Sequence, residues 1–242
     1  MRVWKGMLLL VLLCMLACIS AQAEGVQIET CEITPEGFAR ITWTAPEGTA
    51  GYVVTAHYCQ TEEGPYTEVE RSEAAETECL MLSVPGSLML YTVTSLADGT
   101  YDTRKILAEE EKSTLFPLSG SVRVSLSDRS GEEEAELLAV SDLEKAVLDD
   151  REDTEVWLDA AWEAEGEAYV LLVLEAPNGY RVPLSDNEEK DMAGIAERMP
   201  LSGALDLILA YTGEIPEGEY GLKVYLNGHL AMDTAAFSAA AD

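Results

Sequence analysis

The chain has 242 residues and a formal net charge of −30, because 45 acidic residues outnumber 15 lysines and arginines. This excess of carboxylates repels nucleic-acid phosphates and anionic lipid headgroups, which excludes nucleic acid as a partner. Hydrophobic residues nevertheless make up 48% of the chain, so the charge does not indicate disorder, and the length suits one large or two small domains.

Residues 1–23 have the three parts of a secretory signal peptide. Arg2 and Lys5 make the start positive, and the run from Met7 to Ile19 is almost wholly apolar. Ala21-Gln22-Ala23 then has small residues at the spacing that a signal peptidase needs. A membrane-spanning helix needs about 20 apolar residues, and this run is shorter. We therefore predict export, with cleavage after Ala23 and no membrane span in the mature chain.

A second exit route competes with this cleavage. Met15-Leu16-Ala17-Cys18 resembles a lipobox, the motif at which bacterial lipoproteins are cut before a cysteine that receives lipid. The match is partial, since Met15 stands where leucine is usual and Leu16 where a smaller residue is usual. We favour cleavage after Ala23 over a lipid anchor at Cys18, and expect a secreted or cell-surface location by either route.

The first half of the mature chain alternates short strand patterns with turn residues. The clearest strand begins at Tyr52, where Tyr52, Val54 and Tyr58 share one face. The predicted strands span residues 26–29, 38–44, 52–58, 66–70, 79–84, 88–96 and 100–107. About seven short strands separated by regularly spaced turns are typical of a β-sandwich.

Three cysteines follow the signal, and all of them lie in this first half: Cys31, Cys59 and Cys79. The oxidising exterior that an exported protein meets permits one bridge and leaves one thiol. We favour a Cys59–Cys79 disulfide, because each of these residues begins or ends a predicted strand. The alternative of three free, buried thiols stays open, since sequence alone cannot choose the pair.

The strands around Trp43 carry a family resemblance. The run Ala39–Gly48, followed by Gly51-Tyr52-Val53-Val54, resembles the second and third strands of a fibronectin type III domain. That family buries a tryptophan on its second strand and an aromatic residue at the start of its third, and the resemblance assigns these places to Trp43 and Tyr52. The resemblance covers about residues 26–107 and implies a β-sandwich domain at residues 24–112.

The resemblance departs from the family pattern at one corner. Residues 90–99 resemble the family's sixth strand and the turn after it. The family usually has Pro-Gly, two residues, and then a tyrosine that hydrogen-bonds back across the corner. After Pro85-Gly86 that place is Met89, and Tyr91 comes two residues late. Either the corner is rebuilt with two extra residues, or the tyrosine hydrogen bond is absent.

After a charged segment at residues 109–112, the chain has a second set of strand patterns. The predicted strands span residues 120–128, 136–140, 154–163, 168–176, 180–184, 205–211, 220–226 and 229–238. Asn178-Gly179 and Asn227-Gly228 are strong hairpin signals. Residues 143–148 are expected to form one or two helical turns, and residues 185–199 a long loop or a short helix. We predict an immunoglobulin-like β-sandwich at residues 113–242, of no recognised family.

The sequence contains no set of residues that matches a known catalytic motif. Its two histidines, His57 and His229, lie in different predicted domains, and no nucleophile-elbow, zinc-protease or phosphate-loop motif occurs. Paired carboxylates are uninformative among 45 acidic residues, so they give a glycan hydrolase no specific support. The acidic segments 149–153 and 186–191 lack the order of an EF-hand loop. We predict solvated loops there, and a non-enzyme without metal or cofactor.

Two aromatic residues on polar strand faces indicate where a partner could bind. Trp157 shares its face with Glu155 and Asp159, and Tyr225 shares its face with Lys223. The opposite face of the Trp157 strand is predicted to point inward, with Val156, Leu158, Ala160 and Trp162. A surface tryptophan or tyrosine can stack on a sugar ring or anchor a protein. The alternative, which we favour, is that these residues form contacts between the two domains or beneath a helix.

The expected function is an exported, non-catalytic binding or spacer protein that presents β-sandwich domains to a protein or polysaccharide at the cell surface. The first alternative is a carboxylate-dependent glycan hydrolase or its accessory module, which requires a deep cleft with convergent acids. The second is a structural subunit that pairs by strand addition at an exposed sheet edge.

Overall fold

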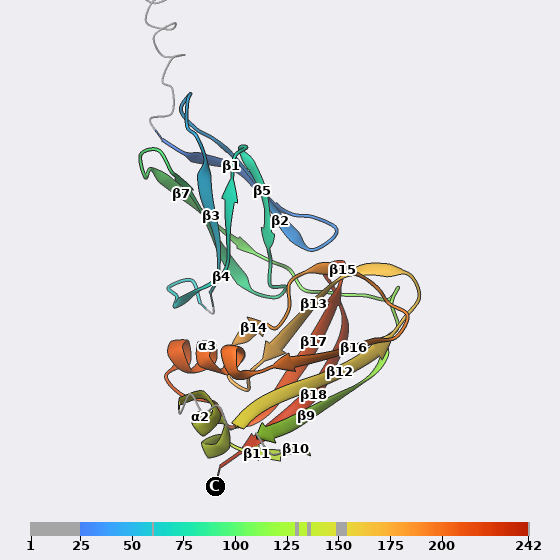
Figure 1. Cartoon of the computed structure of the whole chain (residues 1–242). Helices are drawn as coiled ribbons and strands as arrows, with labels where there is room; N and C mark the ends of the chain where they lie inside the picture. The colour runs from blue at the N-terminus through green and yellow to red at the C-terminus, as the bar shows by residue number, and fades with distance from the viewer. Residues whose placement is uncertain (1–24, 60, 129–130, 135–136, 149–153, 242) are drawn as a thin grey trace, which may run out of the picture.

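The computed structural model describes residues 25–59, 61–128, 131–134, 137–148 and 154–241. These residues form an all-β fold whose sheets fall into two pairs that follow one another along the molecule (Figure 1). Two short helices occur among the described residues, and both lie on one flank of the second pair (Figure 1). The predicted all-β, sandwich-type fold is therefore confirmed.

The first pair combines a three-stranded and a four-stranded antiparallel sheet. The smaller sheet has the order β1–β2–β5, with β1 (Gln27–Ile33), β2 (Phe38–Thr44) and β5 (Glu78–Leu82). The larger has the order β4–β3–β6–β7, with β4 (Tyr66–Ala74), β3 (Tyr52–Cys59), β6 (Leu88–Ser95) and β7 (Tyr101–Leu107). Each of the seven strands predicted in this half has a counterpart.

Alternation along these strands builds the core between the two sheets. Ile41 and Trp43 are buried on β2, and Tyr52 and Val54 are buried on β3. The rings of Trp43 and Tyr52 meet edge to face, with their centroids 5.1 Å apart. Because side chains alternate between the faces of a strand, every second residue of β2 and β3 enters this core.

Tyr91 closes the corner between β5 and β6. Its ring is fully buried, and its hydroxyl donates a hydrogen bond to the carbonyl oxygen of Leu82 at 3.2 Å. Burial raises the pKa of the Tyr91 phenol, so the hydroxyl stays protonated and remains a donor. The hydrogen bond across the corner is therefore present, although Tyr91 comes two residues late.

The three cysteines of this half are free thiols. Cys59 directly follows the buried Tyr58 on β3, so alternation turns it to the opposite face of that sheet. Cys79 belongs to the other sheet, and its Sγ lies 3.5 Å from the sulfur of the fully buried Met81. The expected Cys59–Cys79 bridge is not formed, because the two side chains lie on different sides of the larger sheet.

The second pair combines a four-stranded sheet with a larger sheet that contains the central strand β13. The first has the order β10–β9–β12–β16, with β10 (Gly131–Glu134), β9 (Ser119–Asp128), β12 (Thr154–Glu163) and β16 (Ile195–Pro200). The second has the order β11–β18–β17–β13–β14, with β11 (Leu137–Ala139), β18 (His229–Ala240), β17 (Gly218–Leu226), β13 (Glu167–Glu175) and β14 (Arg181–Pro183). Two further strands join it: β15 (Glu188–Asp191) on β13 and β8 (Glu111–Lys112) on β18.

Several local predictions for this half are confirmed. The inward face predicted for β12 is buried, with Val156, Leu158, Ala160 and Trp162 each at most 3% exposed. The two Asn-Gly signals mark the β13–β14 and β17–β18 hairpins, and Asn227 and Gly228 both have positive φ, as the favoured two-residue hairpin turn requires. The predicted helical turns form α2 (Val140–Leu148).

A helix, α3 (Ser202–Thr212), replaces the strand predicted at residues 205–211. Its buried side chains are Ala204, Leu205 and Ile208. Gly213 ends the helix with a φ of +83°, and its N–H donates to the carbonyl oxygen of Leu209 at 2.9 Å. The prediction was wrong because a short, nearly continuous apolar run has no period that distinguishes a strand from a buried helix.

The acidic segment 185–199, predicted as a long loop or a short helix, contains β15 and most of β16. These strands pair with β13 and β12, respectively. The prediction was wrong because Ile195 and Met199 are four residues apart, a spacing that shares one face on a strand as well as on a helix. Met199 is buried in this way, while the residues on either side of it are exposed.

Replacing Tyr91 by phenylalanine should destabilise the protein by about 1 kcal/mol, because the buried carbonyl of Leu82 then loses its hydrogen bond. Urea denaturation followed by tryptophan fluorescence measures this loss. The control is Tyr101→Phe, since 68% of Tyr101 is exposed. Equal stabilities of Tyr91→Phe and the wild type would contradict a role for this hydrogen bond.

The three thiols of the folded protein should react slowly with an alkylating reagent near pH 8. Burial raises the pKa of Cys31 and Cys59 to about 11 and also raises that of Cys79. At pH 8 only about one in a thousand of the Cys31 and Cys59 thiols is then ionised, and the reaction should speed up about tenfold per pH unit until pH 11. Intact-mass spectrometry of the unreduced protein starting at Glu24 should find three free thiols; a mass lower by two hydrogens would contradict this.

Candidate functional site

Arg181, at the start of β14, joins the two sheet pairs through one guanidinium group. Its Nη1 donates to the carbonyl oxygen of Pro85 at 2.7 Å and lies 3.0 Å from Glu110 Oε2. Its Nε donates to Glu175 Oε2 at 2.6 Å. Only 16% of the arginine side chain is exposed, so these charge-assisted hydrogen bonds are largely shielded from water. A Cβ on Gly86 would overlap Nη1 of Arg181, so a side chain there would displace the guanidinium from these partners.

Tyr225 completes this cluster and is not a free surface residue. It is fully buried, and its hydroxyl donates to Glu110 Oε2 at 2.6 Å. Burial raises the pKa of the phenol, so it stays protonated beside the carboxylate. Its neighbour Lys223 is also buried, and Asp233 neutralises its charge, with Nζ and Oδ2 2.9 Å apart. The prediction of Tyr225 as a binding surface was therefore wrong, and the alternative of a contact between the two halves is correct.

Aromatic rings from both halves meet beside Arg181. Tyr58 of β3 and Tyr180 are in edge-to-face contact, with ring centroids 5.0 Å apart. The hydroxyl of Tyr58 accepts the backbone N–H of Arg181 at 3.2 Å, and the hydroxyl of Tyr180 is hydrogen-bonded to Thr67. Burial raises the pKa of Tyr180 to about 12. The rings therefore stay neutral at physiological pH and contribute both apolar area and hydrogen bonds.

On the other side of the contact the two backbones touch directly. A Cβ on Gly37 would lie 2.7 Å from the Cα of Gly228, and a Cβ on Gly228 would lie 2.8 Å from the Cα of Gly37. Both glycines have positive φ, so glycine is needed there for conformation as well as for space. Next to them, Nδ2 of Asn187 donates to the carbonyl oxygen of Glu36 at 3.0 Å.

The connector, residues 108–118 between β7 and β9, is itself part of the sheet structure. Glu111 and Lys112 pair in parallel with His229 and Leu230 of β18, and the N–H of Ser113 donates to the carbonyl oxygen of Leu230 at 2.9 Å. The connector therefore holds the halves by backbone hydrogen bonds rather than as a loose tether. We call the contacts of Arg181, the aromatic rings, the two glycines and this connector the junction.

Sequence analysis did not single out Arg181 or Glu110. The available signal is the scarcity of cations, since only 15 lysines and arginines occur in a chain with 45 acidic residues. A scarce arginine two residues after an Asn-Gly hairpin turn, and so on a rigid element, is a candidate for a structural ion pair.

Trp157, the other residue predicted as a binding surface, is half-buried on the outer face of β12. The guanidinium of Arg198 lies 4.9 Å from the ring centroid, and Arg198 also reaches Asp159 at 3.6 Å. The indole is therefore part of a polar layer on this sheet. None of the described junction contacts includes Trp157, so the alternative of a contact between the halves does not apply to it. Its role in binding stays a prediction.

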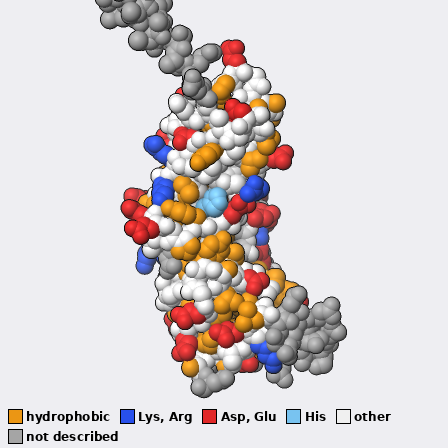
Figure 2. Space-filling model, turned by 90° about the vertical axis from the view of Figure 1, so that its left-hand side faces the viewer, with side chains coloured by type: hydrophobic (Ala, Val, Ile, Leu, Met, Phe, Trp, Pro, Cys, Tyr) orange, Lys and Arg blue, Asp and Glu red, His pale blue; other side chains and the backbone are white. Residues whose placement is uncertain are grey.

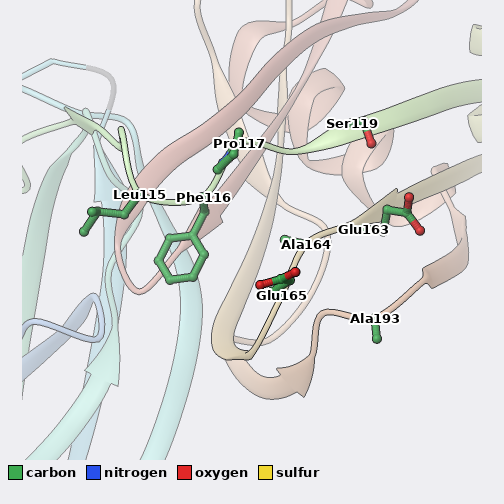
Figure 3. A pocket seen from close by; sticks show the side chains of 8 residues that line it. All are labelled: Leu115, Phe116, Pro117, Ser119, Glu163, Ala164, Glu165 and Ala193. Atoms are coloured by element: carbon green, nitrogen blue, oxygen red, sulfur yellow. The ribbon is translucent and has the colours of Figure 1, made fainter.

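A hollow of about 780 Å³ lies between the connector and the β12–β13 turn (Figure 3). We call it the Phe116 hollow, and it is lined by Leu115, Phe116, Pro117, Ser119, Glu163, Ala164, Glu165 and Ala193. Its walls combine apolar side chains from the connector with carboxylates from the turn. The sequence analysis did not identify it, because the residues that line it come from separate segments.

The candidate metal and catalytic groups do not come together in the described part of the chain. His57 lies 3.8 Å from Glu68 in the first half, and His229 lies 3.5 Å from Glu111 at the junction. No cluster of three or more His, Cys, Asp or Glu side chains suited to a metal occurs among the described residues. The acidic segment 149–153 lies outside the described residues, as do the signal peptide and Cys18.

The chain matches no protein-family model, and no curated protein matches it. The fibronectin type III resemblance therefore stays a prediction. Within the described residues, no helix is long and apolar enough to cross a membrane.

Replacing Arg181 by methionine should destabilise the protein by about 3 kcal/mol, because the shielded carboxylates of Glu110 and Glu175 lose their cation. Urea denaturation measures the loss, and small-angle scattering of the folded variant should show a broader distribution of distances. The control is Arg71→Met, which removes an arginine that is 60% exposed and paired with Glu68. Equal effects of the two substitutions would contradict the role given to Arg181.

Proposed function

We propose that this chain is an exported, non-catalytic protein that presents two firmly joined β-sandwich domains to a protein or polysaccharide at the cell surface. The junction is the observation that carries the proposal. An ion cluster, a tyrosine pair and a glycine contact restrict the angle between the halves, and Figure 2 shows the elongated body that results. A rigid, elongated body keeps its two ends at a set distance, as a spacer or a presenting protein requires.

The first domain, residues 24–112, is proposed to be fibronectin type III-like. The three-plus-four strand arrangement, the buried contact of Trp43 with Tyr52, and the hydrogen bond from Tyr91 support this assignment. The second domain, residues 113–242, is proposed to be an immunoglobulin-like sandwich. Its two facing sheets support this, although α2 and α3 are additions to a simple sandwich.

Export is proposed from the signal pattern of residues 1–23, and the acidic surface is compatible with it. Figure 2 shows acidic side chains spread over the visible face, with apolar side chains between them. Such a surface keeps an exported protein soluble and resists association with anionic polymers. Trp157 on the outer face of β12 is the residue proposed to contact the partner.

Expression of the full chain in a bacterial host tests the proposal. The protein should be recovered outside the cytoplasm with Glu24 as its first residue, and Cys18→Ser should not change its location. If Cys18→Ser instead releases the protein from membranes, the exported protein is lipid-anchored. Accumulation of the uncut chain in the cytoplasm would overturn the proposal.

The binding half of the proposal is tested on the same preparation. Mature protein should be retained by immobilised cell-wall polysaccharide or surface protein of the producing cells, and Trp157→Ala should reduce this retention. The control is Tyr101→Ala, which removes an exposed aromatic residue from the first half. Equal retention of the wild type and Trp157→Ala would remove Trp157 from the binding surface.

A further inference from the structure

We propose that the Phe116 hollow binds a basic, partly apolar peptide segment of a partner protein, with lysine or arginine side chains next to apolar ones. The inference rests on the proposed binding function and specifies the chemistry of the partner. Two properties of the hollow carry it: exposed apolar side chains on one wall, and unpaired carboxylates on the other.

The apolar wall is formed by consecutive residues of the connector. Leu115 is 83% exposed, and Phe116 is half-buried beside it. Figure 3 shows the ring of Phe116 extending from the connector toward the β12–β13 turn, with Glu165 on the facing side. A second hollow of about 410 Å³ shares Ser119 and Glu163 with this one. Because they share these two residues, the two hollows adjoin and form one continuous groove.

The carboxylate wall is formed by the turn between β12 and β13. Glu163 and Glu165 line the hollow, and Glu167 follows them on β13. All three are exposed, and none of the ion pairs between described residues includes them. Arg181 and Lys223, by contrast, already have carboxylate partners. Since no ion pair of the described residues neutralises this turn, a cation of a partner can meet its carboxylates.

The two walls together select the occupant. A lysine or arginine side chain combines an apolar stem with a charged end, so its stem can lie on Phe116 while its charge meets Glu165, which faces that ring (Figure 3). The face of the Phe116 ring also attracts a cation. An acidic peptide is repelled by this turn, and the net charge of −30 steers a basic peptide toward the protein.

The probe is a fluorescein-labelled peptide, Lys-Leu-Lys-Gly-Lys-Leu-Lys, with binding to the mature protein measured by fluorescence anisotropy. The double variant Glu163→Gln/Glu165→Gln should weaken binding about fivefold, since two exposed ion pairs are lost. Leu115→Ser should weaken it about threefold, since an apolar contact is lost. Neither change is expected to unfold the protein, because all three residues are exposed.

The matched control is Glu217→Gln/Glu219→Gln, which removes the same charge at the same spacing from two exposed residues. This pair lies at the opposite end of the β13–β17 ladder, where Glu175 pairs with Gly221. Binding by the control variant should equal that of the wild type. A second control is the peptide in which glutamate replaces each lysine, which should not bind.

Three outcomes would overturn the inference. They are an absence of binding by the wild type, equal weakening by the two double variants, and displacement of the peptide by a neutral glucose oligosaccharide. The second would mean that general acidity holds the peptide, and the third that the groove takes carbohydrate. If the chain is exported and retained as proposed but the peptide does not bind, this inference fails alone. If the peptide binds in the groove but the chain stays in the cytoplasm, the proposed function fails alone.

Discussion

The guanidinium of Arg181 is the group on which the arrangement of the two halves depends. It contacts a backbone carbonyl of the first half, a carboxylate of the connector and a carboxylate of the second half, in a setting that largely excludes water. Removing such charges from water costs several kcal/mol, and the cost is offset only when every partner is in place. The ion cluster therefore penalises other orientations of the halves more than it adds to overall stability.

The other junction contacts also restrict the orientation of the two halves, by packing and backbone contacts rather than by charge. The rings of Tyr58 and Tyr180 bury apolar area and have directional hydrogen bonds, so they favour one rotation of the halves. Gly37 and Gly228 allow a backbone contact that any side chain would prevent. Because the connector is paired with β18, the chain between the halves cannot swing freely. Together these contacts make one body from two sheet pairs.

The few cations are placed unevenly in this acidic chain, and that placement shapes the outer surface. Arg181 and Lys223 are held inside by carboxylates, whereas Glu163, Glu165 and Glu167 lie exposed on one turn. Ion pairing thus withdraws these two cations from the surface, while the three carboxylates of this turn stay available to a partner. The apolar residues next to that turn make it different from the rest of the acidic surface.

The sequence by itself determined the features that depend on neighbours along the chain. Period-two patterns identified most strands and the inward face of β12, and Asn-Gly pairs identified both hairpins, because these signals act within a few residues. Tertiary structure decided the rest. The run that forms α3 and the spacing of Ile195 and Met199 suit a helix and a strand alike, so packing against the sheets made the choice. Tyr225, Cys59 and Arg181 could not be placed from the sequence, since their surroundings come from residues far away in the chain.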